Sequence, residues 1–341
     1  MLNKKSVAEY ATKPVRDHFD GAKIVKIKSI GYGSYGFVYE LILDKTPFKL
    51  ALKVFRLKGQ YEKEVAALKL LGSSSTIPIP EIYLTMNAVE SFPYDVVFME
   101  MMPGKNAFFD YLLPTMSKDK KEGFAKECVK CLMHIHAVKG PAFGPIDNPA
   151  YSSWLDYYKE KVDRIFAGIV AKYQMCDINR DLFELVRKSY GMFNEIFSEP
   201  VTEATLIHGD FNVMNILVDP KTFKPTALID PLNTMYADKE FELHQLRNLT
   251  GDRYNLYELY KKEAGCSRLC DLKSAFYSLF HEMDVFLDTD HFYKFVEIFI
   301  EVHFFKSVHF CRCRLWTMFL RHYQKDSNKN NNYMVADSIT T

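Results

Sequence analysis

Residues 208–217, with the sequence HGDFNVMNIL, are the stretch on which the interpretation of this chain depends. Residues 204–207, with the sequence ATLI, precede it and an apolar strand follows it, so we expect a loop between two short strands. Asp210 and Asn215 lie five residues apart in this loop, and fifteen residues further on an apolar segment ends in Asp230. Hard oxygen ligands that leave room for phosphate are what Mg²⁺ requires, which makes Asn215 and Asp230 candidate metal ligands.

A glycine pattern lies earlier in the chain, at Gly31, Gly33 and Gly36, with Val38 two residues after the last glycine. Alone it is a weak signal, because G-x-G-x-x-G also occurs in dinucleotide-binding folds and by chance. A dinucleotide site needs a strand, the glycines and then a helix, whereas these glycines lie between two predicted strands within residues 24–57. That arrangement is typical of the kinase loop that covers the phosphates of ATP, and a plain tight hairpin is the alternative.

Lys53 lies on the next predicted strand, within the apolar sequence ALKV. A lysine inside an apolar strand is costly unless it meets an anion. In the kinase pattern this lysine contacts the α- and β-phosphates. A helix is predicted over residues 59–72, and on it Glu64 is the preferred partner of Lys53, with Glu62 as the alternative and a solvated helix face possible for either.

These features occur in the order that the kinase pattern requires. In that pattern Asp210 accepts the proton of the substrate hydroxyl, and Asn215 and Asp230 hold Mg²⁺ beside the phosphates. The adenine of ATP is expected to bind the backbone of a linker near Glu100 and Met102.

The chain resembles the aminoglycoside phosphotransferase and fructosamine kinase superfamily, whose members are relatives of the protein kinases. The resemblance covers about residues 25–270 and rests on H-G-D-x-x-x-x-N followed by Ile-Asp-Pro at 229–231. Protein kinases usually carry Arg where Gly209 stands. The stretch 230–243 is more similar to fructosamine kinases, as are the positions of His136 and Trp154. The resemblance implies ATP-dependent transfer of the γ-phosphate to a hydroxyl of a sugar, ketosamine or aminoglycoside-like compound.

We therefore predict an α+β chain with a two-lobed protein-kinase-like fold, in which a small β-rich lobe precedes a larger helical lobe. The predicted bounds are 1–102 for the nucleotide-binding lobe, 103–324 for the catalytic and substrate lobe, and 325–341 for a flexible tail. Helical periodicity is found at 106–139, 150–198 and 255–323, with a β-like interlude at 204–230.

The composition excludes several classes of protein. Lys and Arg number 44 against 43 Asp and Glu in 341 residues, so we expect no nucleic-acid partner. No window reaches the roughly 18 uninterrupted apolar residues of a membrane span. An odd count of seven scattered cysteines favours reduced thiols, and we expect a cytoplasmic protein, with its oligomeric state left open.

Other clusters have competing interpretations. Cys128, Cys131 and His134 recur at helical spacing, where core packing is favoured over zinc, and residues 309–313 resemble them. A solvated helix face is favoured for the acidic residues Glu282, Asp284, Asp288 and Asp290. Five aromatic residues are candidates for contacts with the acceptor, with core packing as the alternative: Trp154, Tyr157, Tyr158, Tyr236 and Phe241.

Two functional alternatives stay open. One is a protein Ser/Thr kinase, which would need a peptide groove. The other is a non-catalytic nucleotide-binding protein, against which the set of Lys53, Asp210, Asn215 and Asp230 argues, because a binding module needs no base.

Overall fold

The computed structural model describes residues 2–32, 36–57, 59–108, 116–231, 233–248 and 250–289. The chain divides into two compact units. The first comprises Met1–Glu160 and Glu199–Ser267, and the second comprises Lys161–Ser198 and Arg268–Thr341. The lobe boundary predicted at residue 102 and the tail predicted at 325–341 stay predictions, and the tail lies outside the described residues.

An antiparallel sheet of five strands forms the N-terminal part of the first unit, in the order β1-β2-β3-β5-β4. Its strands are β1 (Ile24–Tyr32), β2 (Gly36–Leu43), β3 (Lys49–Phe55), β4 (Ile82–Met86) and β5 (Val96–Glu100). Helix α2 (Gln60–Gly72) follows β3. The predicted strands and the predicted helix are therefore found, and with the helices that follow they confirm the α+β class.

The middle strand β3 explains where Lys53 points. Leu50, Leu52 and Val54 belong to one apolar cluster, whereas Ala51 and Phe55 belong to a second cluster that includes residues of α2. Because side chains alternate between the two faces of a strand, Lys53 shares the face of Ala51 and Phe55. The lysine is thereby directed to the face on which α2 packs.

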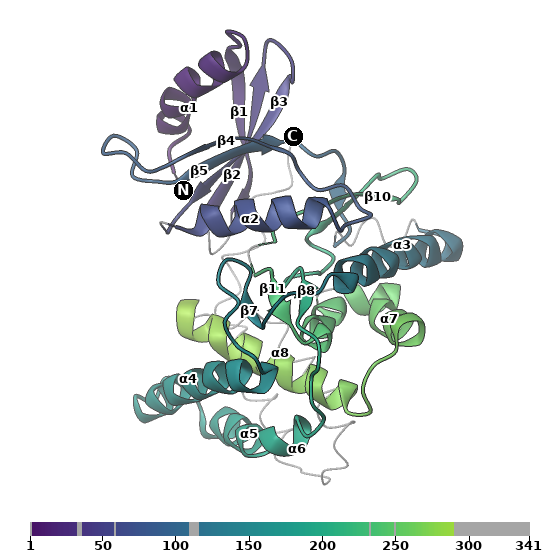
Figure 1. The fold of residues 1–341 in the computed structure, drawn as a ribbon. Coiled ribbons are helices and arrows are strands. Elements are labelled where there is room, and N and C mark those ends of the chain that lie inside the picture. The colour runs from purple at the N-terminus through teal and green to yellow at the C-terminus, as the bar shows by residue number, and fades with distance from the viewer. Residues whose placement is uncertain are drawn as a thin grey trace. The chain divides into compact units, whose positions relative to one another are not determined.

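Helix α1 (Lys4–His18) covers the opposite face of the sheet (Figure 1), and no element was predicted there. The side chain of Asn3 caps its first turn by accepting a hydrogen bond from the backbone of Lys5. Val7, Ala11 and Val15 are spaced by four residues, so they form one buried stripe against the sheet.

Two small three-stranded sheets and several helices complete the first unit, with strand orders β10-β9-β6 and β7-β11-β8. The strands are β6 (Lys105–Asn106), β7 (Gly144–Pro145), β8 (Thr205–Ile207), β9 (Ile216–Val218), β10 (Pro225–Leu228) and β11 (Met235–Ala237). The helices are α3 (Lys118–Ala137), η2 (Lys239–Arg247), η3 (Gly251–Tyr254) and α7 (Leu256–Ala264). The helix predicted over 106–139 begins later, because β6 pairs with β9 before it.

The second unit is helical in the residues that the structure describes. Helix α4 (Trp154–Gln174) is divided between the units, and α5 (Arg180–Gly191), α6 (Phe193–Ile196) and α8 (Cys270–Thr289) belong to the second. Phe193, Phe197 and Phe276 pack their rings in its core. Asp284 of the acidic stretch pairs with Lys161 and Arg164, so this carboxylate is part of a structural ion-pair group.

Candidate active site

Lys53 and Glu64 form a buried ion pair in the first unit. Lys53 Nζ donates to Glu64 Oε2 at 2.6 Å, and the two side chains are only 9% and 3% exposed. Glu62 lies in the first turn of α2 and is exposed, so Glu64 is the glutamate that meets the lysine. Burial opposes the charge on Lys53, but the attraction of Glu64 and Asp230 outweighs it and raises the pKa of Lys53.

Asp230 is the second partner of Lys53. It follows β10, and its carboxylate bonds to the ammonium group while staying 49% exposed. Its backbone has a φ of 62°, a left-handed conformation that is uncommon for residues other than glycine. Such conformations persist where the surrounding structure imposes them, and they cluster at functional sites. Here the backbone amide of Ile229 donates to the oxygen of Asn215 at 2.9 Å, which ties Asp230 to the loop of Asp210.

The loop between β8 and β9 carries Asp210 with both carboxylate oxygens bonded. Asn212 Nδ2 donates to Oδ1 at 2.6 Å, and Asn215 Nδ2 donates to Oδ2 at 2.7 Å. Burial, with Asp230 and Glu242 adding like charge, raises the pKa of Asp210 to about 7, although the two amides oppose the rise. A carboxyl group with a pKa near neutrality is suited to accept a proton.

Glu242 holds the backbone of this loop, a contact that the sequence analysis missed. Its buried carboxylate accepts from the amides of His208 at 3.0 Å and Gly209 at 2.6 Å. His136 Nε2 lies 3.2 Å from the same carboxylate, and its Nδ1 lies 2.6 Å from the hydroxyl of Tyr260. The neutral tautomer with a proton on Nε2 satisfies every one of these contacts. The resemblance includes His136 and the stretch 230–243, but it does not predict that His136 and Glu242 meet.

Gly209 is required by the backbone at this position. Its φ is 83°, and a side chain there would overlap the backbone oxygen of Asn233. An arginine, which protein kinases usually carry at the corresponding place, cannot be accommodated without moving the loop. The local backbone therefore explains why this chain has glycine at position 209, where protein kinases usually have arginine.

Two of the three glycines, which were expected between two strands, lie at the adjoining ends of β1 and β2: Gly31 near the end of β1 and Gly36 at the start of β2. Gly31 pairs with Val38, and Val38 pairs with Lys53 on β3, so the glycine segment is anchored next to the lysine. A side chain at Gly36 would overlap the backbone oxygen of Val54. Gly33 lies outside the described residues.

The two residues predicted to lie near adenine are at the end of β5 and just after it: Glu100 is the last residue of the strand and Met102 follows it. The amide of Glu100 donates to the oxygen of Glu81 at 2.8 Å, so its backbone donor is already used within the sheet. Met102 is buried, and among described residues its backbone makes no hydrogen bond. Of the two, Met102 is therefore the better candidate for a backbone contact with a base.

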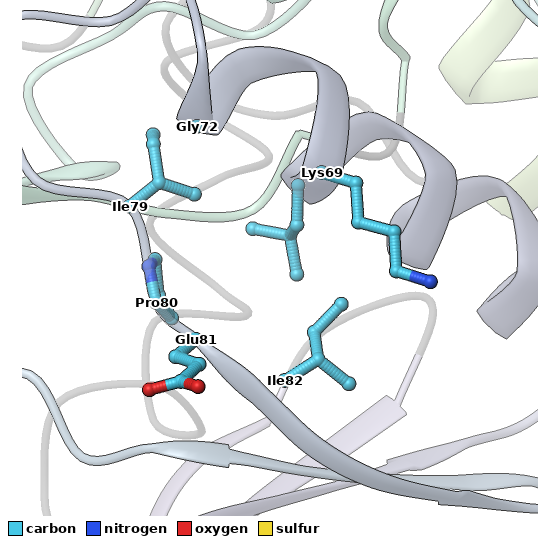
Figure 2. Close-up of a pocket in the computed structure, with 7 residues that line it drawn as sticks. Lys69, Gly72, Ile79, Pro80, Glu81 and Ile82 are labelled. Carbon is cyan, nitrogen blue, oxygen red and sulfur yellow. The ribbon is translucent and has the colours of Figure 1, made fainter.

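A cavity of about 320 Å³ lies elsewhere, between the end of α2 and the segment before β4 (Figure 2). Its lining includes the apolar residues Leu68, Ile79 and Ile82 and the charged residues Lys69 and Glu81. None of the predicted site residues contributes to its lining.

The aromatic residues separate into two groups. Trp154 and Tyr158 are about 1% exposed and stack on each other, so these two form core and cannot contact an acceptor. Phe241 packs against both rings. Tyr236 is partly exposed on β11 and stays a candidate.

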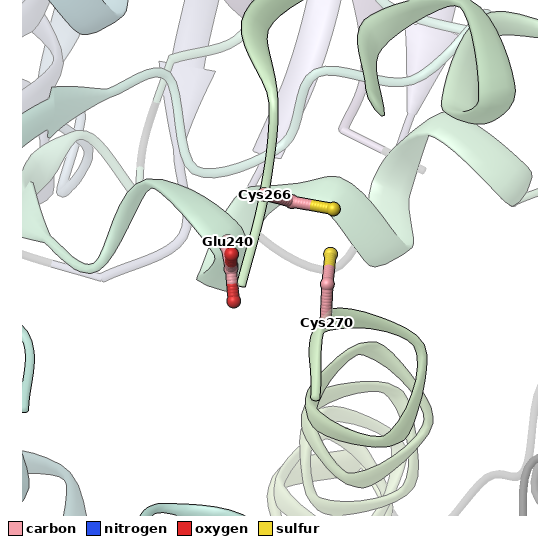
Figure 3. Close-up of side chains that lie close together, drawn as sticks. All are labelled: Glu240, Cys266 and Cys270. Carbon is pink, nitrogen blue, oxygen red and sulfur yellow. The ribbon is translucent and has the colours of Figure 1, made fainter. Parts of the chain in front are cut away.

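The zinc alternative is excluded for α3, because Cys128 and Cys131 are buried while His134 is exposed on the same helix. Residues 309–313 lie outside the described part of the chain. Glu240 and Cys266 lie close together, as two metal ligands could (Figure 3). This carboxylate already accepts hydrogen bonds from the amide of Ser267 at 2.5 Å and from its hydroxyl at 2.7 Å.

Comparison with known proteins finds a family match and distant relatives. A model of the phosphotransferase enzyme family matches residues 26–256. The probable acyl-CoA dehydrogenase IBR3 of Arabidopsis thaliana is 24% identical over 238 residues. That match covers 67% of this chain and 28% of IBR3, so the chain spans less than a third of that relative.

Solved structures are similar over most of the chain. A candidate fructosamine-3-kinase from Haemophilus somnus 129PT has a TM-score of 0.63 at 14% identity, over 88% of this chain and 97% of that one. The GDP complex of aminoglycoside 2′-phosphotransferase-IIIa has a TM-score of 0.63 at 15% identity, over 89% and 99%. These likenesses confirm the kinase-like fold. Among the described helices, none is long and apolar enough to cross a membrane.

Proposed function

The chain belongs to the phosphotransferase enzyme family, and from this premise we propose that it is a kinase that uses ATP and Mg²⁺ to phosphorylate a hydroxyl of a small molecule. The observation that carries the proposal is the meeting of Lys53, Asp230 and the Asp210 loop in one place. Lys53 bonds to Asp230, and Asp230 acts electrostatically on Asp210. Phosphoryl transfer needs a cation beside the phosphates, a carboxylate that can bind a metal ion, and a base. Lys53, Asp230 and Asp210 are these three groups.

The donor set fits a magnesium ion. Asn215 uses its Nδ2 for Asp210, which leaves Oδ1 to face a cation, and Asp230 presents a half-exposed carboxylate. Hard oxygen donors with open positions suit Mg²⁺. Bound there, Mg²⁺ would neutralise charge on the phosphates.

The residues of the chain would supply the remaining steps. Lys53, kept charged by Glu64, would bind phosphate oxygens and orient the nucleotide. Asp210 would orient the acceptor hydroxyl and take its proton as that oxygen bonds to the γ-phosphorus and the bond to ADP breaks. Positioning and charge neutralisation would provide most of the rate.

The proposed acceptor is a sugar derivative, with ketosamines first and aminoglycosides second. The similar structures with fructosamine and aminoglycoside kinase names support this choice. The close approach of Gly209 to Asn233 favours it over a protein kinase, because the arginine usual there has no room.

The test is transfer from ATP to a panel of ketosamines, aminoglycosides, sugars and amino alcohols, followed by mass spectrometry of the products. Asp210→Asn should lower kcat by about 10²–10⁴-fold while nucleotide still binds. Asp119→Asn, at the exposed first turn of α3, is the matched control and should keep wild-type activity. Phosphorylation of casein but of no small molecule would favour the protein-kinase alternative, and nucleotide binding without turnover would favour the non-catalytic one.

A further inference from the structure

Asn212 lies two residues after Asp210 in the loop between β8 and β9. The residue is 7% exposed, and both ends of its side-chain amide are in use. Nδ2 donates to Asp210 Oδ1 at 2.6 Å, and Oδ1 accepts from the backbone amide of Met214 at 2.9 Å. A buried asparagine with both ends bonded has a defined orientation.

The two contacts determine which way the amide faces. If the amide were flipped, its oxygen would face the carboxylate of Asp210 and its NH₂ group would face the amide hydrogen of Met214. Both contacts would become repulsive. The backbone of the loop, through Met214, therefore directs an N–H group at Asp210.

Asp210 is consequently held from two sides. Asn212 takes Oδ1, and Asn215 takes Oδ2 at 2.7 Å and the backbone oxygen at 2.9 Å. The torsion that turns a carboxylate about its last bond is soft and broad. One donor on each oxygen restricts this rotation, whereas one donor alone would leave it loose.

We propose that Asn212 is a positioning residue that holds the Asp210 carboxylate in the orientation that receives the proton of the acceptor. The inference rests on the proposed function, in which Asp210 is the base. The two amides differ in role: Asn215 is also a proposed metal ligand, whereas the hydrogen bonds of the Asn212 side chain within the described residues go to Asp210 and to the backbone of Met214. A misplacement of about 1 Å at a reacting group can cost about 10²-fold in rate.

Three substitutions distinguish this role from a structural one. Asn212→Ser can keep a hydrogen bond to Met214 through its hydroxyl but cannot reach Asp210, and Asn212→Ala loses both contacts. Asn212→Asp has the same shape and keeps the Met214 contact, yet it places a carboxylate against a carboxylate. Asn215→Ala is the comparison variant, since it removes a proposed metal ligand as well.

The measurements are kcat, the KM for ATP, the Mg²⁺ concentration for half-maximal rate, and ADP affinity by calorimetry. They use the acceptor found in the panel, or ATP hydrolysis with water as acceptor if the panel yields none. We expect Asn212→Ser and Asn212→Ala to lower kcat about 10–10²-fold, with the KM for ATP, the Mg²⁺ requirement and ADP affinity within about twofold. Asn212→Asp should be slower than Asn212→Ala, and Asn215→Ala should raise the Mg²⁺ requirement.

Several results would overturn the inference. One is an Asn212→Asp enzyme as fast as Asn212→Ala or faster, and another is an Asn212→Ser enzyme with wild-type kcat. A third is a loss of ADP binding in step with kcat, which would indicate a structural role. If wild-type protein transfers no phosphate, or if Asp210→Asn has no effect, the proposed function itself fails and the role of Asn212 with it.

Discussion

Two groups of charges on neighbouring strands of the same sheet have similar chemistry and opposite consequences. The outer group places Glu40 of β2 between Lys28 and Lys49, at 2.7 and 3.1 Å. The inner group places Lys53 of β3 between Glu64 and Asp230. The outer group has two lysines for one carboxylate, whereas the inner group has two carboxylates for one lysine.

The two groups differ in the sign of their net charge. The outer group is net positive and is structural, whereas the inner group is net negative and can bind a cation. In the outer group the lysines are 45% and 58% exposed, so water solvates the surplus positive charge. In the inner group Lys53 and Glu64 are buried, and the surplus negative charge falls on Asp230 at 49% exposure. A partly enclosed carboxylate without full compensation favours a cation, which fits the proposed metal role.

The largest effect on catalysis is expected when the carboxylate of Asp230 is replaced. Asp230→Asn should lower kcat/KM by about 10³-fold, or about 4 kcal/mol, because the metal loses its charged ligand. The measurement is phosphate transfer over a Mg²⁺ titration, and the requirement for Mg²⁺ should rise. Glu40→Gln, the outer counterpart, should stay within about twofold. An unchanged Mg²⁺ dependence in Asp230→Asn would mean that the inner group, like the outer one, does not bind a cation.

Lys53→Met comes next, with an expected loss of about 10²-fold in kcat/KM, because a donor to the phosphates is lost. The structure also predicts lower stability, since Glu64 is left buried without a partner. Burial already raises the pKa of Glu64 to about 7 against the opposing charge of Lys53. Without Lys53 the folded pKa of Glu64 rises further above the unfolded value, so the stability of Lys53→Met is retained below about pH 4.5 and is lost as the pH rises above it.

The melting temperature of Lys53→Met should therefore fall more at pH 8 than at pH 5, and adding Glu64→Gln should restore it. Lys49→Met is the control on the same strand and should change neither activity nor this pH trend. A pH-independent melting temperature in Lys53→Met would mean that Glu64 is not left charged.

Glu64→Gln should have a smaller effect, of about tenfold in kcat/KM, because the amide keeps a hydrogen bond to Lys53 and loses the charge. Glu62→Gln, two residues away on the exposed side of α2, is the matched control. Steady-state kinetics at varied ATP should place the loss of Glu64→Gln in the KM for ATP at least as much as in kcat. Equal effects of the two variants would contradict the pairing of Lys53 with Glu64.

The smallest effects belong to the outer lysines. Lys28→Met and Lys49→Met should each cost below about 1 kcal/mol of unfolding free energy, because Glu40 keeps its other partner. The double variant should cost more than the sum, since Glu40 would be left buried alone. Hydrogen bonding from Lys28, with Lys49 helping, lowers the pKa of Glu40 despite its burial, so this stability is present above about pH 4.5 and fades as the pH falls. Urea unfolding at pH 7 and pH 3.5 measures both the cost and its pH dependence.

Much of the fold followed from local patterns in the sequence. The strands of the first sheet, the helix that ends at Gly72 and the loop with Asp210 are short-range features of alternation, periodicity and turn residues. Helix α1 was missed because residues 4–18 are dominated by charge, and its buried stripe of small and β-branched residues is narrow. The aromatic residues near 154 could not be sorted, because a ring in the core and a ring in a site have the same sequence signal.

The sequence by itself determined the strands of the first sheet, the helix that carries Glu64, and the spacing of Asp210 and Asn215. Those depend on alternation and on neighbours a few residues apart. Only the tertiary structure decided that Lys53 meets Asp230, 177 residues away, and that Glu242 binds the amides of His208 and Gly209 across more than 30 residues. Contacts between residues so far apart form only when the whole first unit folds and buries these charges together. Local sequence patterns do not predict them.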